Sequence, residues 1–304
     1  MMLSPTNRTV VLGTTADTRP ESVDVTLTEA LSLFAEDYLW QKGYSQNTEN
    51  NYQWAVNSFV KACGDKEVTK ITQDHIKMWR RYMQQNHYTI GAVNAYLYRL
   101  RLLLRWVSKK EVLAIIPDEI LIPKKEKKLP KTLTKAQMGV LIANAEPREK
   151  AMILLMYSSG IRVGELCQIK IQDIVGNIVK VRGKGRKERL AFIDPSAMEA
   201  IKRYLITRND PCPYLFYTKK KSGMSVSTAM DRIKKLSREC GIPATCHVFR
   251  HTFATDMIRE GCGAFHLQKM LGHEHISTTQ MYVHLNDQDI QGAYAKYHKS
   301  LLTK

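Results

Sequence analysis

The sequence predicts a mainly α-helical protein with a small β-sheet, divided into two domains. Apolar residues recur every three or four positions through most of the chain from Leu27 onward, which is the spacing of one helix face. Only one pair of segments, on either side of a Gly-Lys-Gly turn, has the composition of β-strands. A lysine run between two prolines divides the chain, whose 304 residues suffice for two domains of about 100 to 200 residues each.

Charge and composition limit the class of partner. The 46 Lys and Arg against 29 Asp and Glu give a formal net charge of +17, while 44% hydrophobic residues are typical of a globular protein. This excess indicates a polyanionic partner, either nucleic acid or an acidic membrane surface, with a merely basic soluble protein as the alternative. The longest aliphatic stretch, residues 152–156, is far shorter than the ~20 residues of a membrane span. A membrane protein is therefore excluded.

The cysteines indicate the compartment. The chain has 6 cysteines but no Cys-x-x-Cys pair and no apolar signal sequence. We therefore expect reduced thiols in a cytoplasmic protein.

The first domain is predicted over residues 25–118. It follows a flexible tail, residues 1–24, in which Thr, Ser, Pro and Gly alternate without a hydrophobic period. Helical spacing begins at Leu27 and breaks at Gly43, after which Ser45 is placed to cap a second helix.

Two further helices complete this domain, over residues 72–85 and 90–107. The second of them has a continuous apolar face, and its arginines lie elsewhere and give it a basic face (Arg99, Arg101 and Arg105). All four tryptophans fall in this domain, and we expect them to pack in its core rather than to stack on bases (Trp40, Trp54, Trp79 and Trp106).

Residues 119–133 are predicted to form a basic linker between the domains. Pro123 and Pro130 bracket the lysine run, which favours an extended segment. It is either a solvated loop or a strap that crosses a phosphate backbone, and we favour the DNA contact.

The second domain is predicted over residues 134–304. Thr134 and Gln137 form a capping box that begins a helix. Another helix, over residues 147–158, stops at Gly160 and is followed by a short helix over residues 163–167. Strands over residues 178–182 and 189–193 are then expected to form a hairpin with a cationic tip. The rest of the domain has helical spacing.

Several segments of the second domain carry residues suited to phosphate chemistry. His247 and Arg250 share a face near the start of a helix, where the helix dipole favours anions. Arg162 follows a helix-ending glycine, and Glu165 is placed to reach back and orient it. Each feature alone has a structural explanation, namely a surface pair or a salt bridge.

Together these segments resemble the tyrosine recombinase, or phage integrase, family, and particularly its Xer-like and transposon-resolvase members. The resemblance rests on S-G-I-R-V-G-E-L, G-K-G-R-K-E-R, H-V-F-R-H, and L-G-H followed by T-T-Q-M-Y-V-H, in that order over residues 159–284. It implies an N-terminal core-binding, SAM-like domain and a C-terminal catalytic domain. Ser45, Thr48 and Tyr52 are also similar to the family's core-binding domain.

The resemblance implies cleavage and rejoining of duplex DNA through a 3′-phosphotyrosyl intermediate and a Holliday junction, in integration, excision or resolution of DNA elements. Tyr282 matches the nucleophile. Arg162 and Arg250 match the pair that binds the nonbridging phosphate oxygens. His247 matches the residue that acts as base or orients the phosphate, and His273 matches a second hydrogen-bond donor to it.

The remaining site assignments concern an acid and two supporting residues. Lys184 matches the lysine that protonates the departing 5′ oxygen, although Arg186 and Lys187 lie on the same predicted tip and are alternatives. Glu165 matches a supporting acidic position, and His251 is expected to pack beside the site or support it.

No ATP is expected, because the glycine-lysine segment lacks the spacing of a nucleotide-binding loop. The resemblance implies no cofactor or metal ion, since the two arginines do what Mg²⁺ does in other phosphoryl-transfer enzymes. It also implies a bacterial, nucleoid-associated protein. The implied partner is double-stranded DNA with paired inverted core sites, bound by a homotetramer that assembles from monomers in solution. Accessory proteins or a partner recombinase are also compatible with the family. Apolar positions 290, 293, 294 and 297 predict a tail helix that docks on a neighbouring protomer or on its own catalytic domain.

Three alternatives remain. A type IB topoisomerase uses a similar site without paired DNA sites. A zinc hydrolase would use His247 and His251, but Val248 stands where the H-E-x-x-H motif has its glutamate. A DNA-binding protein that has lost catalysis is the third, although every matched position holds a competent residue.

Overall fold

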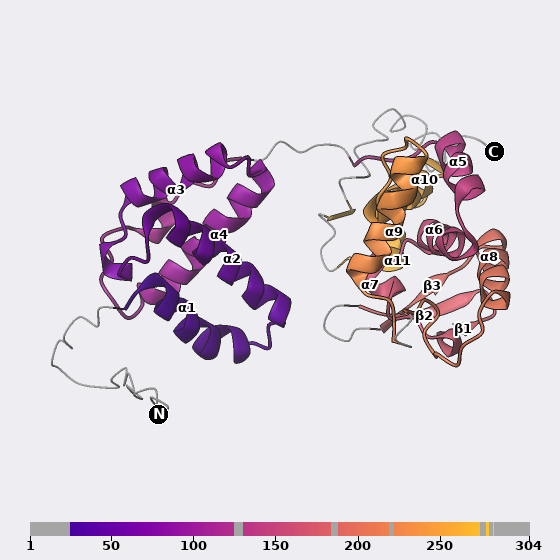
Figure 1. The fold of residues 1–304 in the computed structure, drawn as a ribbon, viewed down its shortest axis with the longest axis horizontal. Coiled ribbons are helices and arrows are strands. Elements are labelled where there is room, and N and C mark those ends of the chain that lie inside the picture. The colour runs from indigo at the N-terminus through magenta and orange to yellow at the C-terminus, as the bar shows by residue number, and fades with distance from the viewer. Residues whose placement is uncertain are drawn as a thin grey trace, which may run out of the picture. The chain divides into compact units, whose positions relative to one another are not determined.

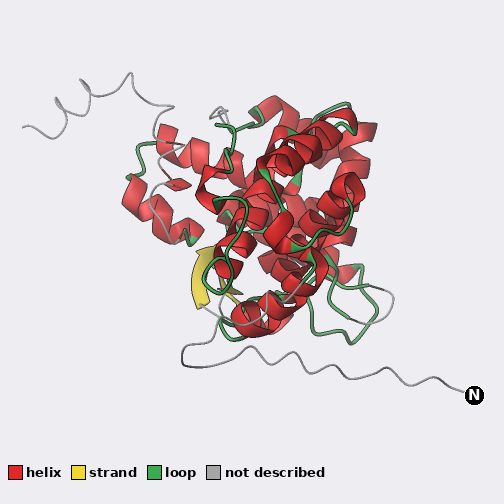
Figure 2. Ribbon diagram, turned by 90° about the vertical axis from the view of Figure 1, so that its left-hand side faces the viewer, coloured by secondary structure: helices red, strands yellow, loops and turns green. Residues whose placement is uncertain are grey.

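The chain forms two compact units, residues 1–127 and 128–304, each with its own hydrophobic core (Figure 1). The computed structural model describes residues 25–124, 130–183, 188–218, 222–273, 278, 279 and 282. Helices dominate and the sheet is small, as the sequence predicted (Figure 2); the sheet in the described residues has three strands. The predicted N-terminal tail, the tip with Lys184 and the tail helix lie outside the described residues.

The first unit consists of helices joined by short turns. They are α1 (Leu27–Phe34), which runs on into a π-helical stretch (Ala35–Trp40), α2 (Gln46–Cys63), a 3₁₀ turn (Val68–Lys70), α3 (Gln73–Gln85), α4 (Ile90–Val107) and a second 3₁₀ turn (Pro117–Glu119). Ser45 precedes α2 as predicted, but its hydroxyl pairs with the Thr48 hydroxyl at 3.2 Å and not with a backbone amide. The predicted four-helix framework is confirmed.

The tryptophans of this unit divide between core and surface. Trp79 is fully buried and donates to the Ser58 hydroxyl at 3.0 Å. Trp40 and Trp54 are 59% and 52% exposed, so the prediction that all four pack in the core is wrong for these two. Trp54 lies off the buried face of α2, and the indole of Trp40 donates to Glu49 at the surface.

The α4 arginines contact the chain that follows the helix. Arg101 donates to the Ile120 carbonyl and Arg105 pairs with Asp118. Ile120 is fully buried in the first core, whereas Leu133 is buried in the second. The first and last parts of the predicted linker, residues 119–133, therefore pack into the cores of the two units.

The second unit surrounds the buried helix α6. Its elements are α5 (Lys135–Asn144), α6 (Pro147–Ser159), α7 (Val163–Leu166), a 3₁₀ turn (Ile171–Asp173), β1 (Ile174–Val175), β2 (Ile178–Arg182), β3 (Glu188–Phe192), α8 (Pro195–Ile206), α9 (Val226–Glu239), α10 (Cys246–Arg259) and α11 (Ala264–Leu271). The capping box of Thr134 and Gln137 is present. The hairpin of β2 and β3 is antiparallel as predicted, whereas the two-residue β1 was not predicted.

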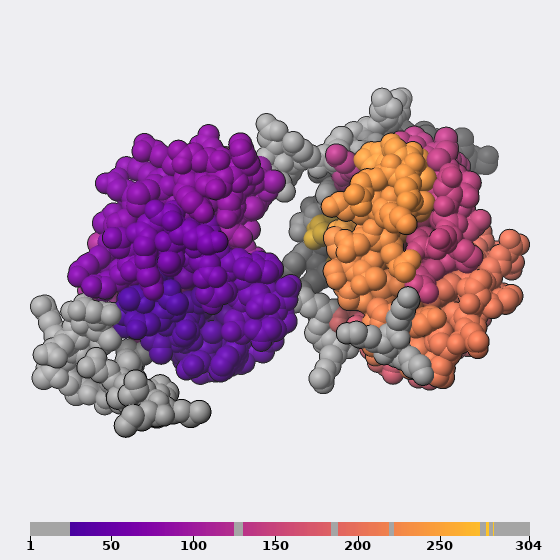
Figure 3. All heavy atoms as spheres, in the orientation of Figure 1, coloured from indigo at the N-terminus to yellow at the C-terminus, as the bar shows by residue number. Residues whose placement is uncertain are grey.

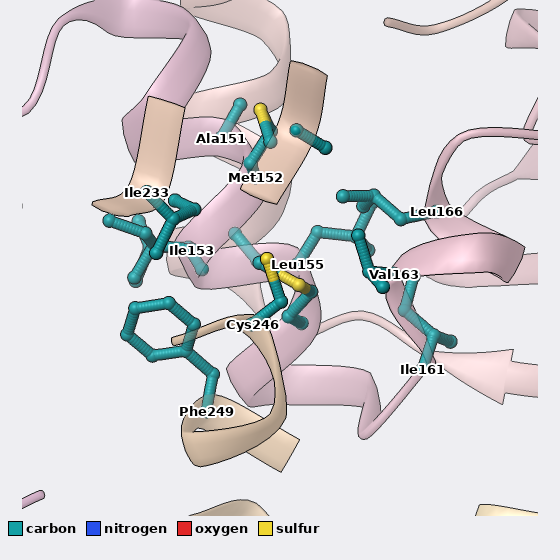
Figure 4. Close-up of a cluster of buried hydrophobic side chains, with 14 of the residues drawn as sticks. Ala151, Met152, Ile153, Leu155, Ile161, Val163, Leu166, Ile233, Cys246 and Phe249 are labelled. Atoms are coloured by element: carbon teal, nitrogen blue, oxygen red, sulfur yellow. The ribbon is translucent and has the colours of Figure 1, made fainter. Parts of the chain in front are cut away.

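Helix α6 is apolar on almost every side because other elements of the unit pack around it, α8 and α10 most extensively. Figure 4 shows its residues Met152, Ile153 and Leu155 among side chains of α7, α9 and α10. In the space-filling view, the orange surface of the region from α9 to α11 occupies part of the visible face of this unit, beside the magenta and coral surface of earlier elements (Figure 3). Among the described residues, no helix has the length and apolar character needed to cross a bilayer. The packing of α10 against α6 brings the two arginine-bearing segments together.

Candidate active site

Arg250 occupies the centre of the site. It is the fifth residue of α10, which Thr245 caps, and it is 6% exposed. Its guanidinium donates to the Gly160 carbonyl after α6 and, at 2.9 Å, to the Leu271 carbonyl at the end of α11. Burial, together with the nearby charge of Arg162, lowers the pKa of Arg250 to about 9. The C-terminal ends of α6 and α11, which carry partial negative charge, therefore bind the Arg250 guanidinium. Because neither contact is a carboxylate, the positive charge of Arg250 is not cancelled by them.

His273 is fixed by Arg250 on one side and by Thr279 on the other. Its Nε2 lies 2.8 Å from Arg250 Nη2 and its Nδ1 lies 2.9 Å from the Thr279 hydroxyl. Because a guanidinium can only donate, Nε2 is the acceptor and Nδ1 carries the proton. Burial and the charges of Arg250 and Arg162 lower the pKa of His273 to about 4. The imidazole is therefore neutral near pH 7.

Arg162 lies at the N-cap of α7, where Glu165 reaches back to it as predicted. The Arg162 amide donates to Glu165 Oε2 at 2.8 Å and its Nη1 donates to Oε1 at 3.1 Å. Its Nη2 donates to the Gly272 carbonyl at 3.3 Å. The side chain of Glu165 is 5% exposed and that of Arg162 41% exposed. Arg162 thus presents part of its guanidinium to solvent while a buried carboxylate orients it.

Arg189, which the sequence analysis did not single out, completes this arrangement. Its Nη2 donates to Glu165 Oε2 at 2.8 Å, and its side chain is 15% exposed. Burial lowers the pKa of Arg189. The available signal was strand alternation, because the pattern that turns Ala191 inward also turns Arg189 inward.

Tyr282 is 1% exposed, and its hydroxyl lies 2.7 Å from His251 Nδ1. Burial raises the pKa of Tyr282, while the charges of Arg250 and Arg162 act in the opposite direction. His251, expected only to pack or support, therefore contacts the phenol directly. Burial lowers the pKa of His251, as do His247 and Arg250.

His247 is exposed, one helical turn before His251, with 6.5 Å between the two ring centroids. Although the residue is exposed at the surface, desolvation of its imidazole lowers the pKa of His247, and so do the charges of Arg250 and Arg162. A neutral imidazole at this position can accept or donate a hydrogen bond.

The structure thus brings together seven of the eight residues proposed from the sequence, namely Arg162, Glu165, His247, Arg250, His251, His273 and Tyr282; Lys184 lies outside the described residues. The cluster holds three arginines but one carboxylate, which pairs with Arg162 and Arg189 and not with Arg250, so the cluster attracts anions. Within the described part of the chain, no group of three or more His, Cys, Asp or Glu is arranged to hold a metal ion.

Comparison with known proteins identifies the family. Residues 131–289 match the phage integrase family, and residues 33–113 match its N-terminal SAM-like domain. The chain is 31% identical over 283 residues to the tyrosine recombinase XerA of Pyrococcus horikoshii, covering 91% of this chain and 96% of that protein. The chain belongs to the phage integrase family, whose tyrosine recombinase members carry out site-specific recombination.

Solved structures share the fold. The Tn1549 transposon integrase in complex with a circular intermediate DNA matches with a TM-score of 0.74 at 16% identity, over 88% of this chain and 99% of that one. A lambda integrase tetramer bound to a Holliday junction matches with a TM-score of 0.67 at 19% identity, over 83% and 79% of the two chains. These matches support the predicted pair of a helical SAM-like domain and an integrase catalytic domain.

Proposed function

We propose that this protein cleaves and rejoins duplex DNA at specific sites through a 3′-phosphotyrosyl intermediate, with Tyr282 as the nucleophile. The observation that carries the proposal is the convergence of Arg162, Arg250 and His273 with the Tyr282 hydroxyl in one positively charged cluster. The two guanidiniums bind the nonbridging oxygens of the scissile phosphate and stabilise the charge that develops on them.

In the proposed reaction, Tyr282 Oη bonds to phosphorus and the bond from phosphorus to the 5′ oxygen breaks. His247 orients the phosphate or accepts the tyrosine proton. His273 Nε2 accepts from Arg250 in the free protein, so His273 donates a hydrogen bond to the phosphate only after Nε2 has taken up a proton and left Arg250. Lys184, or Lys187 on the same tip, protonates the departing 5′ oxygen. A 5′ hydroxyl of the partner strand then attacks the phosphotyrosyl bond, which re-forms a phosphodiester and releases Tyr282. The bond between protein and DNA conserves the energy of the broken phosphodiester, so no ATP or metal ion is required.

The proposed assembly is a homotetramer on two duplexes with inverted core sites, joined through a Holliday junction. It is supported by the fold shared with the lambda integrase tetramer and by the net charge of +17. Integration, excision and resolution all use this chemistry.

The first test traps the covalent intermediate. Purified protein is incubated with nicked DNA that carries inverted repeats from the region flanking its gene, and the complex is denatured in SDS. The wild type should yield a DNA-linked peptide that contains Tyr282, attached to the 3′ phosphate. Tyr282→Phe should still bind DNA but yield no adduct, because only the attacking oxygen is lost.

The matched control is Tyr157→Phe, which removes a phenol that donates to Asp256 at 2.9 Å elsewhere in the second unit. It should form adduct. An SDS-resistant complex with Tyr282→Phe would refute the nucleophile. Intact binding without any wild-type adduct, on every substrate, would instead favour a protein that recognises DNA without cutting it.

Two further assays separate the alternative enzymes. Adduct formation in excess EDTA should be undiminished, whereas a zinc hydrolase would lose its activity. Relaxation of supercoiled plasmids that lack the paired sites would indicate a type IB topoisomerase, and we expect none.

A further inference from the structure

Arg189 shares one buried carboxylate with Arg162. Glu165 Oε2 accepts both Arg189 Nη2 and the Arg162 amide at 2.8 Å, and Oε1 accepts Arg162 Nη1 at 3.1 Å. Three N–H donors from two arginines thus converge on Glu165, which is 5% exposed. Because the carboxylate is buried away from water, its negative charge is stable only while these three donors are hydrogen-bonded to it.

Arg189 also contacts the second group that holds Arg162. A Cβ added at Gly272 would lie 2.6 Å from Arg189 Nε and 2.9 Å from its Cδ, so the arginine stem passes directly against this glycine. The Gly272 carbonyl accepts Arg162 Nη2 at 3.3 Å. Both anchors of the Arg162 guanidinium, Glu165 and Gly272, are therefore braced by Arg189.

The sharing of Glu165 also has an electrostatic consequence. If Arg162 alone faced this carboxylate, their attraction would pull the guanidinium toward Glu165 and compete with a phosphate for it. A second cation on the other oxygen of the same carboxylate weakens that competition. Arg162 is then still oriented by Glu165, but the carboxylate does not fully balance its positive charge, which remains able to attract a phosphate.

We propose that Arg189 is a positioning residue for Arg162, acting through Glu165 and the Gly272 turn. This inference rests on the proposed function, because Arg162 is there assigned to the scissile phosphate. Arg189 itself does not touch the substrate.

The test uses the full-length protein and single-turnover adduct formation on nicked DNA. Arg189→Met keeps the stem but removes charge and donors, and should slow cleavage by roughly 10- to 100-fold, the usual effect of removing the partner that orients a site ligand. Arg189→Lys, which keeps the charge but not the fork, should show a smaller loss. The control Arg182→Met removes an exposed arginine of the same hairpin, paired with Glu188, and should cleave at the wild-type rate.

A double-mutant cycle separates positioning from a general structural role. In an Arg162→Met background, Arg189→Met should cause little further loss, because the group that it positions is absent. On a substrate whose scissile phosphate is a methylphosphonate, the loss from Arg189→Met should shrink, since that group lacks the charge that Arg162 binds. Wild-type rates for Arg189→Met, a fully additive loss, or an equal loss on both substrates would each overturn the proposal.

Arginine side-chain NMR provides a readout that needs no activity. The Arg162 Nε–H and Nη–H signals should exchange faster with water in Arg189→Met than in the wild type or in Arg182→Met. If the wild type forms no adduct but this difference appears, the positioning holds and the proposed function fails. Unchanged Arg162 signals would overturn the positioning whatever the activity.

Discussion

At the scale of single residues, the two arginines that we propose to bind phosphate are held in different ways. Arg250 is bound by two main-chain carbonyls and a neutral imidazole, whereas Arg162 is bound by a carboxylate and one carbonyl. Arg250 therefore keeps its full charge inside the protein, with main-chain dipoles in place of water. Such a buried cation needs the fork geometry of arginine, because one ammonium cannot reach all three acceptors.

This difference predicts unequal effects of lysine substitutions on stability. Arg250→Lys should lower the free energy of unfolding by ~1–3 kcal/mol, because it leaves buried acceptors unpaired. Arg162→Lys, at a partly exposed position, should change stability less. Both variants should lose most cleavage yet bind DNA, because a point charge does not reproduce bidentate binding of phosphate. Chemical denaturation and adduct assays measure the two effects, and equal destabilisation by the two variants would contradict the interpretation.

The histidine environment predicts how stability depends on pH. Burial lowers the pKa of His273 from 6.5 to about 4. Between these two pH values, His273 is therefore protonated in the unfolded chain but neutral in the folded protein. Above pH 6.5 both states are neutral at this residue and the difference vanishes. As the pH falls from 6.5 toward 4, unfolding becomes more favourable and the melting temperature should fall. His273→Gln should reduce this fall, and parallel melting profiles for variant and wild type would exclude His273 as a cause.

At the scale of elements, the site depends on how helices end. Gly160 terminates α6 at φ +61°, and its carbonyl accepts from Arg250. A Cβ at this position would lie 2.5 Å from the Phe253 ring, so the turn admits no side chain. The same turn carries the chain into Arg162. One helix end thus fixes both arginines.

Gly160→Ala should therefore destabilise the second unit and slow cleavage. The left-handed backbone alone costs about 1–3 kcal/mol, and the overlap with Phe253 adds to it. Gly139→Ala is the control, since Gly139 lies within α5 with no atom within 4 Å of an added Cβ. It should stabilise by ~0.5–1 kcal/mol. Equal melting temperatures for the two variants would show that the turn is not strained.

Elements encoded by neighbouring residues were predictable, whereas features that depend on tertiary packing were not. The capping box at Thr134, the stop at Gly160 and the β2–β3 hairpin follow from local residue patterns, and all are present. The exposure of Trp40 and Trp54 depends on which helix faces meet, which no local pattern specifies. The contact of Arg189 with Glu165 likewise joins residues 24 positions apart. Recognition of the catalytic set came from four motifs in order, and the bond between His251 and Tyr282 became evident only in the fold.

At the scale of the whole molecule, the candidate site and most of the net positive charge belong to the same unit. Every described residue of the candidate site belongs to the second unit. Residues 128–304 have 29 Lys and Arg against 15 Asp and Glu, whereas residues 1–127 have 17 against 14. Most of these basic residues lie outside the candidate site, so binding of a polyanion should involve many exposed charges. The proposed cleavage instead depends on a few charges that are partly or wholly buried.

This division predicts that salt affects binding much more than cleavage. Each phosphate contact releases counterions, so a protein making six to ten of them loses about 10³- to 10⁵-fold in affinity between 50 and 200 mM salt. The single-turnover rate of DNA already saturated with protein should change far less, because buried charges are poorly screened. Fluorescence anisotropy and adduct formation at saturating protein measure the two quantities on the same DNA. If the saturated rate fell with salt as steeply as the affinity, the scissile phosphate would be held by exposed cations and not by the enclosed arginine cluster.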